Sequence, residues 1–345
     1  MKPPDVPQGR GTIPPPAFAF LLRPLGPVQR LQEHVVGSQQ LLAYGALAIG
    51  VVCIGWSAIF VKFAGIPGPA SAFYRMLISG LVLIPWRLLR KGSWPSQSGL
   101  LLILAGGTCY ALDLALWNSS ILLTTAAMAT LLANNAPLWV GLGTLFIFRE
   151  KLSRKYWLGL FISLSGMIIL MGFDAWRHLR FNTGELLAIS ASVAYAGYML
   201  TTQRARVHTD TLTFMAISAL TSILVLGVLN LAMGIPLTGY SGKAWAALAG
   251  MGLISQLGGW LAINYALGHL RAAPVSVSLL GQAVVTTLLA MPLLGEFPAL
   301  HQLAGGLLVL AGIFFVNQNR APLEMPQEAS AESARCIPAG GVDGG

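Results

Sequence analysis

Two ionisable residues stand inside long apolar stretches of this sequence, Arg75 in the run 69–88 and Asp113 in the run 98–118. A charge surrounded by lipid costs at least about 2–3 kcal/mol, so each of these residues needs a physical reason. A guanidinium can hold a carboxylate, and a carboxylate can take up and release a proton. The competing interpretation is a charge pair that only fixes helix packing, because both residues lie at a similar depth in neighbouring runs.

The composition sets the environment in which these residues work. Of the 345 residues, 55% are hydrophobic and 10% are charged, whereas soluble domains carry about a quarter charged residues. This predicts a polytopic membrane protein in contact with a lipid bilayer. The net charge of +9 does not indicate nucleic acid, because the basic residues lie in short loops between apolar runs. The three cysteines form no disulfide or metal pattern, and we expect no cofactor.

Ten apolar runs follow one another from Leu41, each close to the roughly 20 residues that cross a bilayer. They are 41–63, 69–88, 98–118, 124–148, 156–173, 184–203, 211–231, 244–266, 272–294 and 299–317. The fold class predicted is therefore an all-α polytopic membrane protein with ten transmembrane helices.

The basic residues predict the orientation of these helices, since Lys and Arg favour cytoplasmic loops. With both termini inside, all Lys and Arg lie on the inner side except Arg75 and four outer ones, Lys62, Arg177, Arg180 and Lys243. We expect an inner-membrane protein with disordered cytoplasmic ends at 1–40 and 319–345, because these segments are rich in Pro, Gly and polar residues.

The two halves of the chain resemble each other. At an offset of 146 residues, WNSSILLTTAAMATLL (117–132) lies over INYALGHLRAAPVSVS (263–278), and Glu150, Gly159 and Gly166 fall on Glu296, Gly305 and Gly312. Each half, 41–173 and 184–318, holds five predicted spans. Since five is odd, the second half crosses the membrane in the opposite sense, which predicts two inverted five-helix repeats.

Ten spans in two halves, an acidic residue closing a small-residue run (Glu150, Glu296), and a following helix with two glycines seven apart resemble the EamA type of the drug/metabolite transporter superfamily. The resemblance covers residues 41–318. It implies export or import of small metabolites such as amino acids or related amphiphilic compounds. Proline often follows the glutamine of the ninth span in this family, but here Ala283 follows Gln282. A break like that expected beside Pro137 in the fourth span is therefore left open in the ninth.

Helical spacing groups the polar and aromatic residues of the spans into faces that could line a substrate site. The candidate substrate-binding residues are Trp56, Arg75, Tyr110, Asp113, Asn134, Asn135, Tyr195, Gln256, Trp260, Asn264 and Gln282. Aromatic rings mixed with amides suit an amphiphilic organic solute. For most of them the alternative, interhelical packing and interfacial aromatic belts, is favoured. Asn134 and Asn135, beside Pro137, fit either role.

Other conspicuous residues have structural interpretations. Glu150 precedes the predicted Ser153 helix cap and suits the helix dipole. Gly159, Ser163 and Gly166, together with Gly305 and Gly312, predict close packing in the fifth and tenth spans.

The sequence thus predicts a secondary transporter, expected to be an exporter, that works by alternating access on a small organic metabolite. Proton or ion coupling and a homodimer stay open. The rivals are a membrane scaffold or receptor subunit, which moves no solute, and an intramembrane enzyme. An enzyme is disfavoured because the spans carry no HExxH, GxSxG or comparable catalytic motif.

Overall fold

The computed structural model describes residues 27–90, 94–123, 129, 132–172, 182–294 and 299–318. Within these residues every regular element is a helix. Helix α1 starts at Pro27, so helical structure begins well before the apolar run that opens at Leu41. The segments 1–26 and 319–345, and Glu296 with its predicted structural role, lie outside the described residues.

Among the described residues the helices make ten passes through one bundle, and each pass overlaps one of the ten predicted runs. The first half contains α1 (Pro27–Gly55) with α2 (Ser57–Ala64), α3 (Gly68–Leu89), α4 (Gln97–Leu123), α6 (Ala136–Phe146) and α7 (Arg154–Met171). The second half contains α9 (Thr183–Arg206), α10 (Thr211–Ala232), α11 (Gly242–Gly250) with the π-helix η2 (Met251–Gly259) and α12 (Trp260–Leu267), α13 (Ala272–Ser278) with α14 (Gly281–Leu294), and α15 (Leu300–Asn317).

Eight of these passes are long and apolar enough to cross a membrane. The fourth pass contains α6, a shorter apolar helix. The sixth pass, α9, is long enough but contains Glu185, Arg204 and Arg206. These charges, with several hydroxyl-bearing residues, lower its hydropathy, although the helix lies inside the bundle against α4.

The contacts between helices recur when each helix is replaced by its counterpart in the other half. Helix α7 packs on α15, and α3 packs on α10, so the fifth and second passes each meet their own counterpart. The contact of α4 with α9 is mirrored by that of α1 with α12, and the contact of α6 with α9 by that of α1 with α14. These pairings are those of two inverted five-helix repeats.

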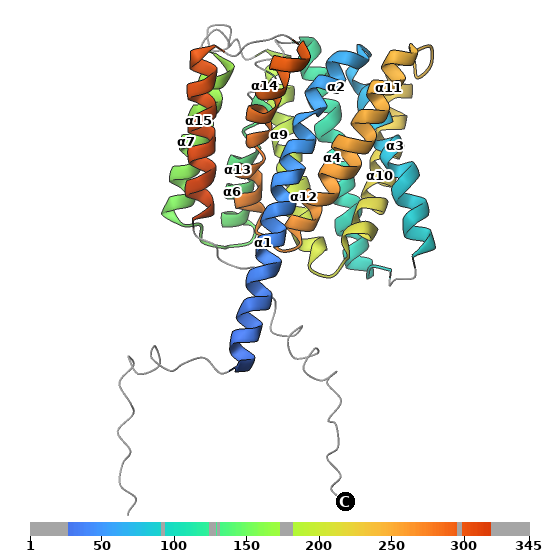
Figure 1. Ribbon diagram of the computed structural model, residues 1–345. Helices are drawn as coiled ribbons and strands as arrows, with labels where there is room; N and C mark the ends of the chain where they lie inside the picture. The colour runs from blue at the N-terminus through green and yellow to red at the C-terminus, as the bar shows by residue number, and fades with distance from the viewer. Residues whose placement is uncertain are drawn as a thin grey trace, which may run out of the picture.

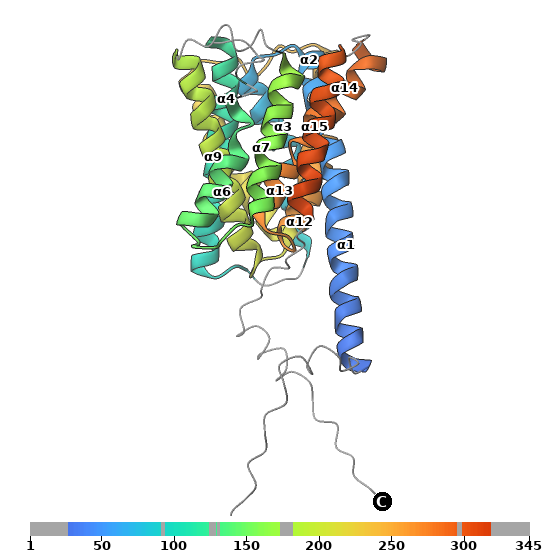
Figure 2. The same ribbon diagram turned by 90° about the vertical axis from the view of Figure 1, so that its left-hand side faces the viewer.

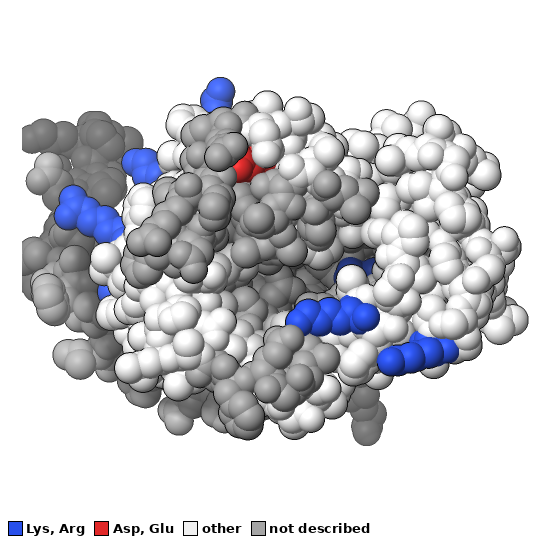
Figure 3. Space-filling view, turned by 90° about the horizontal axis from the view of Figure 1, so that it is seen from above, with Lys and Arg blue, Asp and Glu red and all other residues white. Residues whose placement is uncertain are grey.

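The first helix begins and the last helix ends on the same side of the bundle. Helix α1 begins and α15 ends at the lower side in Figure 1. Helix α7 also begins there, whereas α15 begins at the upper side, as an inverted repeat requires. Seen from above, the described part of the opposite face is largely uncharged, with few Lys and Arg side chains (Figure 3).

Glycines form the seam between α7 and α15, which lie side by side in Figures 1 and 2. A Cβ atom added to Gly166 would lie 2.7 Å from the carbonyl oxygen of Gly305, and one added to Gly312 would lie 2.4 Å from that of Gly159. The Ser163 hydroxyl donates a hydrogen bond to the Val309 carbonyl across the seam (3.3 Å). The predicted close packing is confirmed, and it joins the fifth pass directly to the tenth.

The ninth pass is broken although it lacks the proline that the fourth pass has. Helix α13 ends at Ser278 and α14 begins at Gly281. At this point Leu280 N–H donates to Val277 O and Gln282 N–H donates to Leu279 O, which are tighter i→i−3 bonds. At the repeat offset this break matches the turn at Asn134 and Asn135. The question left open by Ala283 is settled in favour of a break.

The loop before α7 is held by the predicted Ser153 cap and by an ion pair to α9. The Ser153 hydroxyl caps α7 by accepting a hydrogen bond from Tyr156 N–H (3.2 Å). Glu150 forms an ion pair with Arg204 of α9 (3.8 Å), and the Arg204 guanidinium lies 3.9 Å from the centre of the Phe148 ring. An exposed ion pair contributes about 0–1 kcal/mol, so Glu150 links the loop before α7 to the end of α9 without large energetic weight.

Candidate functional site

A hydrogen-bonded cluster around Arg75 joins α2, α3 and α4 of the first half to η2 of the second half. The guanidinium of Arg75 on α3 donates through Nε to Gln256 Oε1 of η2 (2.6 Å) and through Nη2 to the Tyr110 hydroxyl of α4 (3.2 Å). The Tyr110 hydroxyl donates to the same Gln256 oxygen (3.0 Å), closing the ring. A longer bond from Nη1 reaches Ser57 Oγ (3.4 Å). Arg75, Tyr110 and Gln256, distant in sequence, thus form one polar centre.

Aromatic rings form one wall of this centre. Tyr110 stacks on Tyr198 with ring centroids 4.7 Å apart, and Trp260 meets Tyr110 edge-on at 5.1 Å. Tyr195 packs edge-on against Trp260 at 6.0 Å. The Asn264 amide donates through Nδ2 to the Tyr198 hydroxyl (3.1 Å). The predicted faces of α4, α9 and α12 therefore meet, and they place π surfaces and amides beside a guanidinium.

The described residues show no direct contact between Asp113 and Arg75. The two side chains interact electrostatically, but the guanidinium hydrogen bonds go to Gln256, Tyr110 and Ser57 instead. Asp113 is half-buried on α4, three residues after Tyr110, and forms no hydrogen bond or ion pair within the described part of the chain. The pair considered from the sequence is thus an electrostatic interaction without direct contact. Asp113 places a carboxyl group near a cation, with its oxygens not committed to that cation.

The second half contributes to the Arg75 centre through the π-helix η2. Gln256 lies within η2 and Trp260 begins α12 directly after it. A π-helix has a wider turn than an α-helix, and such segments occur frequently at functional sites. Asn264 is buried on the same helix and also donates to the Trp260 carbonyl (2.8 Å), as Asn118 does to Leu114 O at the matching repeat position (2.6 Å).

Other predicted site residues lie at helix breaks and not in the Arg75 centre. Trp56 occupies the break between α1 and α2 and stacks on Phe60 (5.9 Å). The Asn135 amide donates to Leu132 O (3.2 Å) and, like Asn134, is half-buried before α6. Gln282 lies in the first turn of α14, where its carbonyl approaches Gly55. These four residues surround breaks in the first, fourth and ninth passes, and their substrate role stays a prediction.

Ser57 was not among the sequence candidates although its hydroxyl accepts from Arg75. A serine at the start of a short helix is common, and nothing local distinguishes it. Only its place beside the break at Trp56 could have pointed to it.

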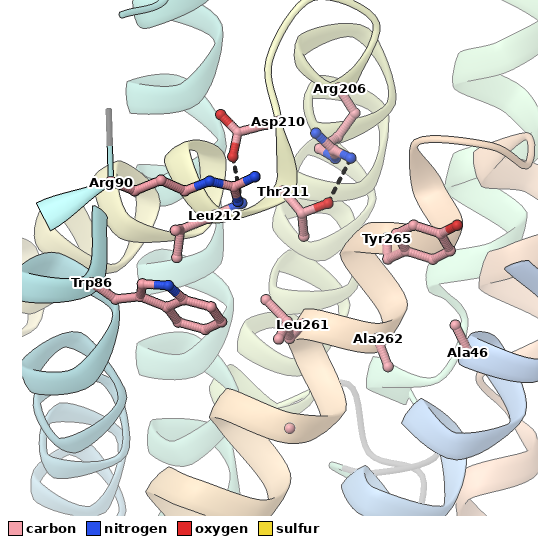
Figure 4. A pocket seen from close by; sticks show the side chains of 11 residues that line it. Ala46, Trp86, Arg90, Arg206, Asp210, Thr211, Leu212, Leu261, Ala262 and Tyr265 are labelled. Carbon is pink, nitrogen blue, oxygen red and sulfur yellow. Dashed lines mark hydrogen bonds between the residues drawn. The ribbon is translucent and has the colours of Figure 1, made fainter. Parts of the chain in front are cut away.

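A pocket of about 480 Å³ lies elsewhere, at the end of the bundle where α3 ends and α10 begins (Figure 4). It shares no residue with the Arg75 centre.

Comparison with known proteins identifies the architecture. Residues 41–172 and 182–318 each match the model of the EamA-like transporter family. The chain is 22% identical over 277 residues to an uncharacterized transporter, YdfC, of Bacillus subtilis, covering 80% of this chain and 90% of that protein. It is 24% identical over 260 residues to the pseudopaline exporter CntI of Pseudomonas aeruginosa, covering 74% and 88%.

A solved crystal structure has the same fold, with a TM-score of 0.68 at 19% identity over 81% of this chain and 96% of the other. The family model matches two consecutive segments that together make up most of the sequence, and these segments are the two halves exchanged by the helix contacts described above. The chain therefore belongs to the EamA-like transporter family and is a multi-pass membrane protein.

Proposed function

We propose that this protein is a secondary exporter of a small organic metabolite, an amino acid or related amphiphilic compound, which moves by alternating access between the halves 41–173 and 184–318. The Arg75 centre carries this proposal. A guanidinium can hold a substrate carboxylate, and the rings of Tyr110, Tyr198 and Trp260 can cover an apolar portion. Because Arg75 and Gln256 belong to different halves, movement of the halves would open and close this centre.

Export and orientation rest on two further observations. One relative carries the name of an exporter, and α1 begins on the same side of the bundle as α15 ends (Figure 1). With the basic loops on that side, both termini are cytoplasmic in an inner membrane.

Transport by the purified protein in proteoliposomes tests this function against a scaffold or receptor. We expect release of one or more radiolabelled amino acids from a panel. Absence of flux for every panel member, with protein shown to be folded and correctly inserted, would favour the scaffold instead.

Asp113→Asn is expected to lower flux at least about tenfold or to remove its dependence on pH. The substitution keeps the size of a half-buried side chain but removes a titratable carboxyl group near Arg75. A rise of ~1.4 kcal/mol in the barrier to transport corresponds to a tenfold lower rate. Initial rates over a pH series would measure this. Glu150→Gln at the loop ion pair is the matched control. A normal rate and pH profile for Asp113→Asn would exclude a coupling role.

A further inference from the structure

The pocket lies on the side of the bundle on which α1 begins, where several helices leave the membrane. Helix α3 ends at Leu89, α10 begins at Thr211 and α12 ends at Leu267, and residues beside all three ends line it. This is the level of the lipid headgroups for a bundle of this kind. From Tyr265 of α12 to Gly258 of η2 the pocket follows the eighth pass into the apolar zone over about two helical turns.

The lining changes from charged to apolar along that direction. Arg90 and Asp210 both line the pocket, and Figure 4 shows Trp86, Leu261 and Ala262 below them. Trp86, Arg90, Asp210 and Gly258 are exposed, so the pocket opens to the surroundings of the bundle. An amphiphile with a polar head and an apolar chain fits this gradient.

Two arginines line the pocket, Arg90 and Arg206, and they differ in whether their guanidinium groups are already hydrogen-bonded to the protein. Within the described residues, the Arg90 guanidinium forms no hydrogen bond or ion pair. The neighbouring Arg206 is engaged through all three of its nitrogen atoms, since it donates to Asn264 O, Thr209 O and Thr211 Oγ1. Arg90 is thus the cation that remains to bind a phosphate.

Asp210 offers the complementary charge. One of its oxygens accepts from Leu212 N–H (3.1 Å) and Thr213 N–H (3.2 Å) as the cap of α10, while the side chain as a whole stays exposed. Burial alone would raise the pKa of Asp210, but the hydrogen bonds from Thr213 and Leu212 and the Arg206 guanidinium lower it overall, which keeps the carboxylate ionised.

We propose that this pocket is a binding site for a zwitterionic phospholipid, phosphatidylethanolamine, with the phosphate at Arg90, the ammonium group at Asp210 and the start of an acyl chain along Trp86 and Leu261. Charge complementarity selects this occupant. An anionic headgroup such as phosphatidylglycerol would meet Arg90 but place no cation against Asp210, and a phosphatidylcholine ammonium cannot donate a hydrogen bond to the carboxylate.

The glycine at the apolar end provides a way to close the pocket. A Cβ atom on Gly258 would meet only the Leu253 carbonyl oxygen, at an ordinary 3.5 Å. The Cβ atom of Gly258→Leu therefore has room, and the rest of the leucine side chain occupies space at the apolar end of the pocket.

Native mass spectrometry of the full chain in detergent, titrated with phosphatidylethanolamine, phosphatidylglycerol or phosphatidylcholine, tests the site. We expect preferential retention of phosphatidylethanolamine. Arg90→Gln should weaken binding of all three lipids about tenfold, as expected for a charge-assisted hydrogen bond of ~1.5 kcal/mol. Gly258→Leu should abolish the retention, and Arg154→Gln, an exposed arginine at the start of α7, should not change it.

Asp210→Asn provides the sharpest readout, because asparagine caps a helix as well as aspartate does but carries no charge. This variant should lose the preference for phosphatidylethanolamine and bind phosphatidylglycerol more tightly than the parent protein. An unchanged preference would overturn the proposal, as would equal retention of all lipids by the parent. Displacement by soluble phosphoethanolamine as effectively as by the whole lipid would also overturn it and assign the pocket to a soluble zwitterion.

Discussion

Arg75→Gln is expected to reduce transport about 10- to 100-fold while leaving a folded protein. The reduction follows from the loss of a charge-assisted hydrogen bond to an anionic substrate group, worth about 1.5–3 kcal/mol. The fold should tolerate the change because Tyr110 still donates to Gln256 Oε1 (3.0 Å), so these two partners of Arg75 keep a hydrogen bond. Flux in proteoliposomes, normalised to monodisperse protein on a sizing column, measures the effect.

Arg75→Lys separates charge from geometry at the same position. Lysine keeps the positive charge but cannot reach Gln256, Tyr110 and Ser57 from one planar group, as the guanidinium does. We expect intermediate activity with a raised apparent KM. Arg154→Gln controls for loss of an arginine elsewhere. Full activity of Arg75→Gln on a carboxylate-bearing substrate would show that Arg75 only holds the helices together.

Gly312→Ala is expected to destabilise the protein more than any other single methyl addition considered, by at least about 3 kcal/mol. The new Cβ atom would lie 2.1 Å from Ser163 Oγ, 2.4 Å from Gly159 O and 2.6 Å from Ser163 N. Two of these are backbone atoms of α7, so no side-chain rotation relieves the collision and the helices must separate. Thermal unfolding in detergent, followed by the loss of monodisperse protein, measures the shift in midpoint.

Gly306→Ala is the matched control, since it adds the same methyl group to the same helix. Its Cβ atom would meet Val284 and Leu170 side chains at 3.7–3.8 Å, which is ordinary contact. We expect a midpoint close to that of the parent protein. Equal midpoints for the two variants would mean that the seam between α7 and α15 is looser than its geometry indicates.

Local sequence signals predicted the parts of this fold that depend on local chemistry. Apolar length located the ten passes, and the spacing of Gly159, Gly166, Gly305 and Gly312 located the seam. The Ser153 cap also carries its own signal, because a serine before a basic, aromatic helix start satisfies free N–H groups. Each of these features arises within about one helical turn or from a repeated spacing.

The arrangement of the Arg75 centre could not be predicted in the same way. Arg75 and Gln256 are 181 residues apart, and no local pattern states which buried polar groups will meet. Arg75 therefore bonds to an amide and a phenol, although Asp113 on the next pass was the obvious partner. The break at Leu279 and Leu280 also lacked a proline signal, and it follows from the packing of α13 and α14 against different neighbours.

The Tyr110–Gln256 hydrogen bond spans 146 residues, which is the register of the duplication itself. A position on the axis of a symmetric dimer always faces an identical residue, so two separate copies of a five-helix unit would set tyrosine against tyrosine or glutamine against glutamine there. When both copies lie in one polypeptide, each residue can mutate independently of its counterpart in the other half. A phenol donor can then face an amide acceptor, and the middle of the protein gains a polarity that no pair of identical subunits could have.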